Sequence, residues 1–103
     1  MDTTFFLDRA KHKLGVDSDY ALAKALKMRA STISGYRAGR SRMDDDAAFK
    51  VAQILGIDPI LPIAAANAER TKSPEMKEFW EGLVSKFAKS FNSLMPRPTP
   101  RPA

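Results

Sequence analysis

Apolar residues recur along this chain at the three- and four-residue spacing of a helix. No segment sustains the alternation of polar and apolar positions that marks a strand. Segments with the helical pattern lie at about residues 3–14, 19–26, 30–38, 45–55, 60–69 and 74–94. The pattern therefore predicts an all-α protein.

Cap and break residues delimit these segments. Side chains that can accept hydrogen bonds from the first turn of a helix precede four of them: Thr3 or Thr4, Asp17 and Ser18, Asp44, and Ser73. Glycines that can end a helix in a left-handed conformation follow three of them: Gly15, Gly39 and Gly56. Proline fits a helix only within the first turn, so Pro62 places the start of the fifth helix near residue 60.

The predicted helices divide into a domain, one further helix and a tail. Residues 1–70 hold five helices whose inward positions supply a hydrophobic core, among them Leu7, Leu22, Val51 and Leu61. Residues 73–94 form a sixth, amphipathic helix. Residues 95–103 include four prolines and two arginines. We expect this last segment to be a disordered, extended basic tail.

The segment Leu22–Gly39 has the residue types that two steeply crossing helices require. Ala23 is small enough for the point where the helices touch, and Met28 fills the turn between them. Ile33 and Tyr36 provide apolar anchors on the inner face of the second helix. The outer face is then expected to present four small residues, which can approach base edges closely: Ser31, Thr32, Ser34 and Gly35.

Positive charge concentrates on the same segment. The chain has a formal net charge of +5, and residues 44–78 contribute a net negative charge. Between Tyr20 and Met43 there is no acidic residue. Six cations fall in this interval: Lys24, Lys27, Arg29, Arg37, Arg40 and Arg42. A basic run that coincides with such a helix pair is typical of a surface that binds phosphate groups.

At these residues the chain resembles the lambda-repressor-like (Cro/CI-type) family of bacterial and phage regulators, over about residues 3–58. The matching positions are Ala23, Leu26, Met28, Ser31–Ser34, Tyr36, Gly39 and Ala52–Ile57. The resemblance implies a five-helix, helix-turn-helix domain that binds the major groove of DNA. The short chain with an added aromatic helix also resembles small regulators of filamentous phages and prophages, which implies a repressor of a phage operon.

The resemblance also implies roles for individual residues. Residues at the front of the third helix are expected to contact bases: Arg29, Ser31, Thr32, Ser34 and Gly35. Surrounding cations are expected to contact phosphates and set the register on the DNA: Lys24, Lys27, Arg37, Arg40 and Arg42. Hydroxyl groups discriminate weakly between bases, so we expect part of the specificity to come from DNA shape.

Three departures from the family pattern affect these expectations. Lys27 stands where the family usually has a glycine, and a left-handed backbone at a lysine costs up to about 1 kcal/mol. Arg29 replaces the serine or threonine that often caps the recognition helix. Ala30 and Gly35 replace long side chains that contact bases in many relatives. The recognition helix is therefore short of side chains that bind a base through two hydrogen bonds.

The sixth helix carries more apolar surface than one small domain needs to bury. Its stripe comprises Phe79, Trp80, Leu83, Val84, Phe87 and Phe91. The stripe could pack on its own domain or pair in a homodimer. A third alternative is contact with a membrane or another protein, because Lys86 and Lys89 flank the stripe. Regulators of this kind bind two half-sites as symmetric dimers, so we expect a homodimer.

The composition gives little support to an enzyme, a metal site or a membrane protein. The chain has no cysteine, and we expect its single histidine, His12, to be a solvated surface residue. The acids Asp44–Asp46 are expected to complement a helix N-terminus rather than bind a cation. No secretory signal or membrane span is evident. We therefore expect a cytoplasmic protein with no cofactor, no metal and no catalytic activity.

Together these patterns predict a sequence-specific DNA-binding transcriptional regulator, expected to be a homodimeric repressor that occupies operator DNA. The alternative is an antitoxin or anti-repressor whose aromatic sixth helix binds another protein.

Overall fold

The computed structural model describes residues 1–94, and the side chains of residues 1–89. All the regular secondary structure in this part of the chain is helical, with no strand, which confirms the predicted all-α class. Its helices are α1 (Thr3–Leu14), α2 (Asp19–Ala25), α3 (Ala30–Arg37), α4 (Asp45–Leu55), α5 (Ile60–Arg70) and α6 (Pro74–Leu94). The predicted tail over residues 95–103 and the side chain of Phe91 lie outside the described residues.

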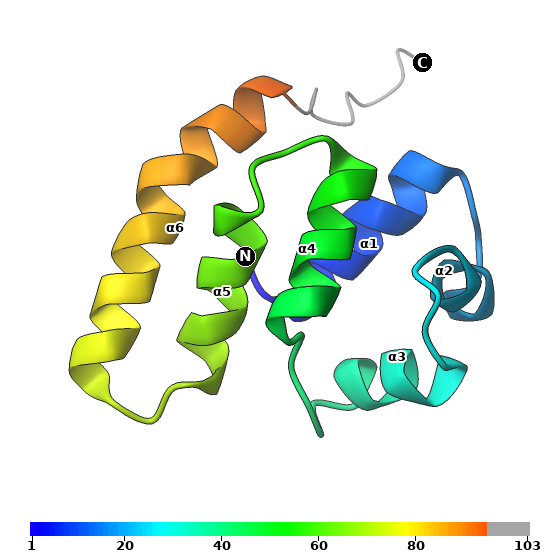
Figure 1. Cartoon of the computed structure of the whole chain (residues 1–103), viewed down its shortest axis with the longest axis horizontal. Coiled ribbons are helices and arrows are strands. Elements are labelled where there is room, and N and C mark those ends of the chain that lie inside the picture. Colours follow the sequence, from blue (N-terminus) through cyan, green and yellow to red (C-terminus); the bar gives the residue numbers. More distant parts are fainter. Residues whose placement is uncertain (95–103) are drawn as a thin grey trace, which may run out of the picture.

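The helices are arranged around α1, α4 and α5, which pack against one another at the centre of the molecule (Figure 1). On one side, α2 and α3 contact each other and both contact α1. On the other side, α6 lies along α5 and packs on no other helix of the described residues. The α2–α3 pair and α6 therefore occupy opposite sides of the molecule.

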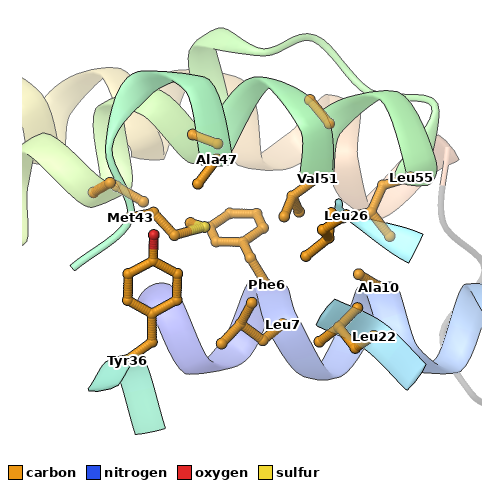
Figure 2. Close-up of a cluster of buried hydrophobic side chains, with 14 of the residues drawn as sticks. Phe6, Leu7, Ala10, Leu22, Leu26, Tyr36, Met43, Ala47, Val51 and Leu55 are labelled. Atoms are coloured by element: carbon orange, nitrogen blue, oxygen red, sulfur yellow. The ribbon is translucent and has the colours of Figure 1, made fainter. Parts of the chain in front are cut away.

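The hydrophobic core is built around Phe6. Its ring is completely buried and lies between the side chains of Met43 and Val51 (Figure 2). Leu22 of α2 and Leu55 of α4 close the same cluster. Burying a side chain of this size contributes about 1.5–3 kcal/mol. The core therefore joins α1, α2 and α4. Ile33 and Tyr36 of α3 pack into the same cluster.

Most of the predicted helix boundaries are confirmed. Ser18 caps α2, and Asp44 caps α4 by accepting a hydrogen bond from the backbone of Ala47. The expectation that Thr3 or Thr4 caps α1 is wrong. Asp2 is the cap, because its carboxylate accepts the backbone N–H of Phe5. The side chain of Thr3 turns into the protein instead, where it is almost completely buried.

Lys27, in the turn between α2 and α3, has a positive φ of 56°. It is the one residue other than glycine with a positive φ among those described. Lys27 therefore has the left-handed backbone that was expected to be strained at a lysine. Met28, the next residue, packs partly buried against the core and fills the turn as predicted.

Replacing Lys27 with glycine is expected to raise the free energy of unfolding by about 0.5–1 kcal/mol, because glycine adopts this backbone conformation without a Cβ clash. The matched control is Lys24→Gly, inside α2, which should lower that free energy by about 1 kcal/mol. Urea unfolding followed by circular dichroism measures both changes. A similar loss of stability in the two variants would contradict strain at residue 27.

Packing of α6 on α5 divides the predicted apolar stripe. Val84 and Phe87 pack against the core, and Trp80 and Leu83 are half-buried. Phe79 remains 54% exposed, and its ring meets Trp80 edge to face. Part of the stripe therefore serves the domain itself, and part remains on the surface. Over residues 1–94, no helix is long and apolar enough to cross a bilayer.

Candidate nucleic-acid interface

The third helix has one buried face and one exposed face. Ile33 and Tyr36 are buried, as predicted, and they hold α3 against the core. Ser31 and Ser34 are exposed on the opposite face, and Thr32 is half-buried at its edge. The helix begins without a side-chain cap, since Arg29 at the cap position makes no such hydrogen bond. The exposed face of α3 is thus narrow, polar and built from short side chains.

Gly35 does not lie on this exposed face, and the expectation that it does is wrong. The residue is buried, and a Cβ atom there would stand 3.2 Å from Oγ of Ser41. The glycine therefore allows the loop that follows α3 to pass close to the helix. Its backbone N–H and carbonyl belong to the helix and the turn, since Gly35 O accepts the N–H of Arg40.

Exposed cations lie on α2, at the start of α3, and in the turn and loop that flank α3. Lys24, Lys27, Arg29 and Arg40 are all exposed. None of the four forms an ion pair with an acid of residues 1–89. The ammonium of Lys24 lies 5.5 Å from the centre of the exposed Tyr20 ring. These charges are available to an anionic partner, because no internal carboxylate has to be displaced.

Arg37, the predicted phosphate contact that lies on α3, is instead paired with acids of the protein. Its Nη1 lies 2.7 Å from Asp8 of α1, and its Nε and Nη2 donate to Asp19 of α2 at 3.1 and 3.0 Å. Lys11 lies 3.3 Å from the same Asp19 carboxylate. A guanidinium held by two carboxylates from two helices fixes the angle at which α3 leaves the domain. Arg37 is therefore a positioning residue for the exposed face.

The hydrogen bonds from Arg37, together with Lys11, hold the pKa of Asp19 below its ordinary value despite the partial burial of the carboxyl. A carboxyl whose pKa is lower in the folded state stabilises the fold above its unfolded pKa, which is about 3.9. That contribution disappears as the pH falls through the folded pKa. The ion pairs of Asp19 with Arg37 and Lys11, which join α1, α2 and α3, should therefore stabilise the fold less in acid.

Replacing Asp19 with asparagine is expected to lower the free energy of unfolding by about 1 kcal/mol at pH 7, a small value because the carboxyl is partly exposed. The difference from the wild type should shrink as the pH falls through the folded-state pKa of Asp19, because the protonated carboxyl no longer pairs with Arg37. Urea unfolding at a series of pH values measures it. Asp17→Asn, at an exposed neighbour, should change stability little. A difference that is the same at pH 7 and pH 2 would contradict the ion pair.

A second network fixes the loop after α3. Glu69 of α5 accepts hydrogen bonds from the backbone and the hydroxyl of Thr3, at 2.6 and 2.7 Å. Its other oxygen lies 3.1 Å from Nε of Arg42. Arg42 also donates to the carbonyl of Gly39, and Thr3 accepts the backbone N–H of Met43. The loop is thereby tied to α1 and α5, and Arg42 is largely occupied inside the protein.

The structure thus brings together only part of the predicted set. Two groups remain at the surface, on α2, on α3 and in the turn and loop that flank α3: the predicted base-contact residues Arg29, Ser31, Thr32 and Ser34, and the cations Lys24, Lys27 and Arg40. Arg37, Arg42 and Gly35 serve the architecture behind that face. Sequence reasoning did not find Thr3 and Glu69, which are 66 positions apart and carry no local signal. No protein-family model, curated protein or solved structure matches this chain.

Proposed function

We propose that this protein is a sequence-specific, double-stranded DNA-binding regulator of the lambda-repressor-like type. In this proposal α2 and α3 form a helix-turn-helix, α3 enters the major groove, and occupation of an operator represses transcription in a bacterial cytoplasm, from a phage or host gene. The observation that carries it is the exposed face of α3, which presents short hydroxyl side chains, together with four exposed cations on α2, at the start of α3 and in the turn and loop that flank it, none of which pairs with an acid of residues 1–89.

Each exposed residue then has a separate task. Arg29, at the front of α3, is the longest side chain able to reach a base edge, and Ser31 and Ser34 approach the groove closely. Lys24, Lys27 and Arg40 are available for phosphates on either side of the groove. Arg37 and Arg42, assigned to phosphates from the sequence, act instead by holding α3 and its following loop in position.

Base recognition by one arginine and a few hydroxyls is weaker than recognition by several side chains that each make two hydrogen bonds. We therefore expect DNA shape to supply part of the specificity, through the cost of fitting the duplex to a rigid α3. The two networks that fix α3 and its loop suit this mode, because a rigid surface penalises a duplex of the wrong shape.

The experiment that tests this function is selection of duplexes from a random pool by the full chain, followed by fluorescence anisotropy. We expect one motif to be enriched and to bind about 1,000-fold more tightly than a scrambled duplex of the same composition. Ser31→Ala/Ser34→Ala should reduce this ratio about tenfold and leave binding to the scrambled duplex unchanged. Ser85→Ala, on exposed surface of α6, is the control. Pools without an enriched motif would contradict sequence-specific binding.

A second candidate function rests on α6, whose exposed Met76 and Phe79 favour binding to another protein, as in an antitoxin or anti-repressor. Unlike DNA binding, this second function does not depend on the exposed residues of α3. Variants of the α3 face would leave such a function intact, whereas Phe79→Asp would abolish it without changing the affinity for DNA half-sites.

A further inference from the structure

An apolar strip on α6 faces away from the domain. It consists of Met76, which is 43% exposed, Phe79, which is 54% exposed, and the half-buried Leu83. Residues three and seven positions apart lie on one side of a helix, within about 60° of each other. Val84, which packs on the domain, lies about 140° around the helix from Phe79, whereas Phe87, which also packs there, lies only about 40° from Leu83. Phe79 therefore points away from the domain, and Leu83 lies at the edge of the surface that α6 packs on it.

Opposite charges stand at the two ends of this strip. Glu75 precedes it and Lys86 follows it, and both are exposed. At about 100° per residue, both point to the same side of the helix, within about 40° of Phe79. They lie about 8 Å before and after the peptide that joins Trp80 and Glu81. If two copies of α6 lie side by side in opposite directions, the Glu75 end of one copy therefore meets the Lys86 end of the other.

Gly82 is a further unusual residue in this helix. A glycine inside a helix destabilises it relative to alanine, and it is expected where another backbone comes close. A Cβ atom at Gly82 would meet no atom of the described residues within 4 Å. Packing within the chain therefore does not require a glycine here. Gly82 lies on the exposed side of α6, next to the strip.

We propose that α6 pairs in antiparallel orientation with α6 of a second copy of this chain. A two-fold axis near the Trp80–Glu81 peptide sets Phe79 against the partner subunit's Leu83 and Glu75 against the partner subunit's Lys86. Gly82 lets the two helices approach. The charge pattern selects a second copy as the occupant, because α6 itself supplies both signs at matching distances from the axis.

This pairing rests on the proposed function and refines it. A helix-turn-helix regulator needs two recognition helices for two half-sites. Because α6 and α3 lie on opposite sides of the molecule, pairing through α6 leaves both copies of α3 exposed (Figure 1). The stripe expected from the sequence is thereby divided: Val84 and Phe87 pack on the domain, and Phe79 and Leu83 are assigned to the dimer. Met76, which lies outside that stripe, joins the dimer contact.

The test is sedimentation equilibrium of the full chain without DNA, with circular dichroism to verify that each variant is folded. We expect the wild type to be a dimer of twice 11.4 kDa and Phe79→Asp to be a monomer. Glu75→Lys and Lys86→Glu should each weaken the dimer at least tenfold, because each sets like charges opposite one another. The double variant Glu75→Lys/Lys86→Glu should restore the dimer to within about threefold of the wild type. Glu81→Lys, at an exposed residue about 160° around the helix from Phe79, should have no effect.

Other results would overturn the proposal. A monomeric wild type, a dimer unaffected by Phe79→Asp, or a double variant as weak as the single variants would each exclude antiparallel pairing of α6. Because DNA is absent from this experiment, its failure leaves the proposed function intact. Failure of that function would appear separately, as the lack of an enriched motif in the duplex selection.

Discussion

Replacing Phe6 with alanine is expected to lower the free energy of unfolding by about 3–5 kcal/mol, the largest stability effect we expect from a single substitution. The ring is completely buried at the junction of α1 and α4, with Met43 and Val51 on either side (Figure 2). Small domains are stable by about 5–15 kcal/mol, so the variant should be close to unfolding at 25 °C. Urea unfolding followed by circular dichroism measures the loss.

The matched control for this substitution is Phe49→Ala in α4. Phe49 is the same residue type but is 47% exposed, so its removal leaves no cavity and should cost less than about 1 kcal/mol. If the two variants lost similar amounts of stability, Phe6 would not be at the centre of the core.

Removing two cations beside α3 is expected to have the largest effect on DNA binding. For each phosphate that the protein no longer neutralises, the slope of log K against log salt becomes shallower by about 0.9. Lys24→Ala/Arg40→Ala, at two of the proposed phosphate contacts, should therefore reduce the steepness of the slope by about 2 and weaken binding about 30-fold at 0.15 M salt. Anisotropy titrations of one duplex at several salt concentrations measure both quantities. Lys24 and Arg40 are both exposed, so the fold should be unaffected.

A variant with the same change in net charge separates local contacts from bulk charge. Lys72→Ala/Lys77→Ala removes two exposed cations beside and within α6, on the opposite side of the molecule from α3. Its salt slope should equal that of the wild type. Equal slopes for the two double variants would show that net charge, rather than the surface around α3, governs the affinity.

The helices were predictable from the sequence because their signals are local. Ser18 and Asp44 each bond a backbone N–H three residues later, and Gly56 ends α4 with a positive φ. Each of these features is encoded within one turn of the chain. The buried positions of Ile33 and Tyr36 followed in the same way from helical spacing.

The features that the sequence could not predict depend on contacts between distant residues. Thr3 is a plausible cap by its type, but Asp2 takes that role and the buried Thr3 bonds Glu69 across the fold. Arg37 lies in a basic run, yet acids on α1 and α2 neutralise it once the helices pack. The burial of Gly35 depends on the path of the loop that brings Ser41 against α3.

The most direct test of the DNA surface is a titration of isotope-labelled protein with the selected duplex, followed by amide chemical shifts in nuclear magnetic resonance spectra. We expect the largest changes over residues 27–43, which include the turn before α3, its exposed face and the loop that follows. Amides of α6 should change little. Changes concentrated in α4 or α6, with the amides of Ser31 and Ser34 unmoved, would contradict DNA binding through α3.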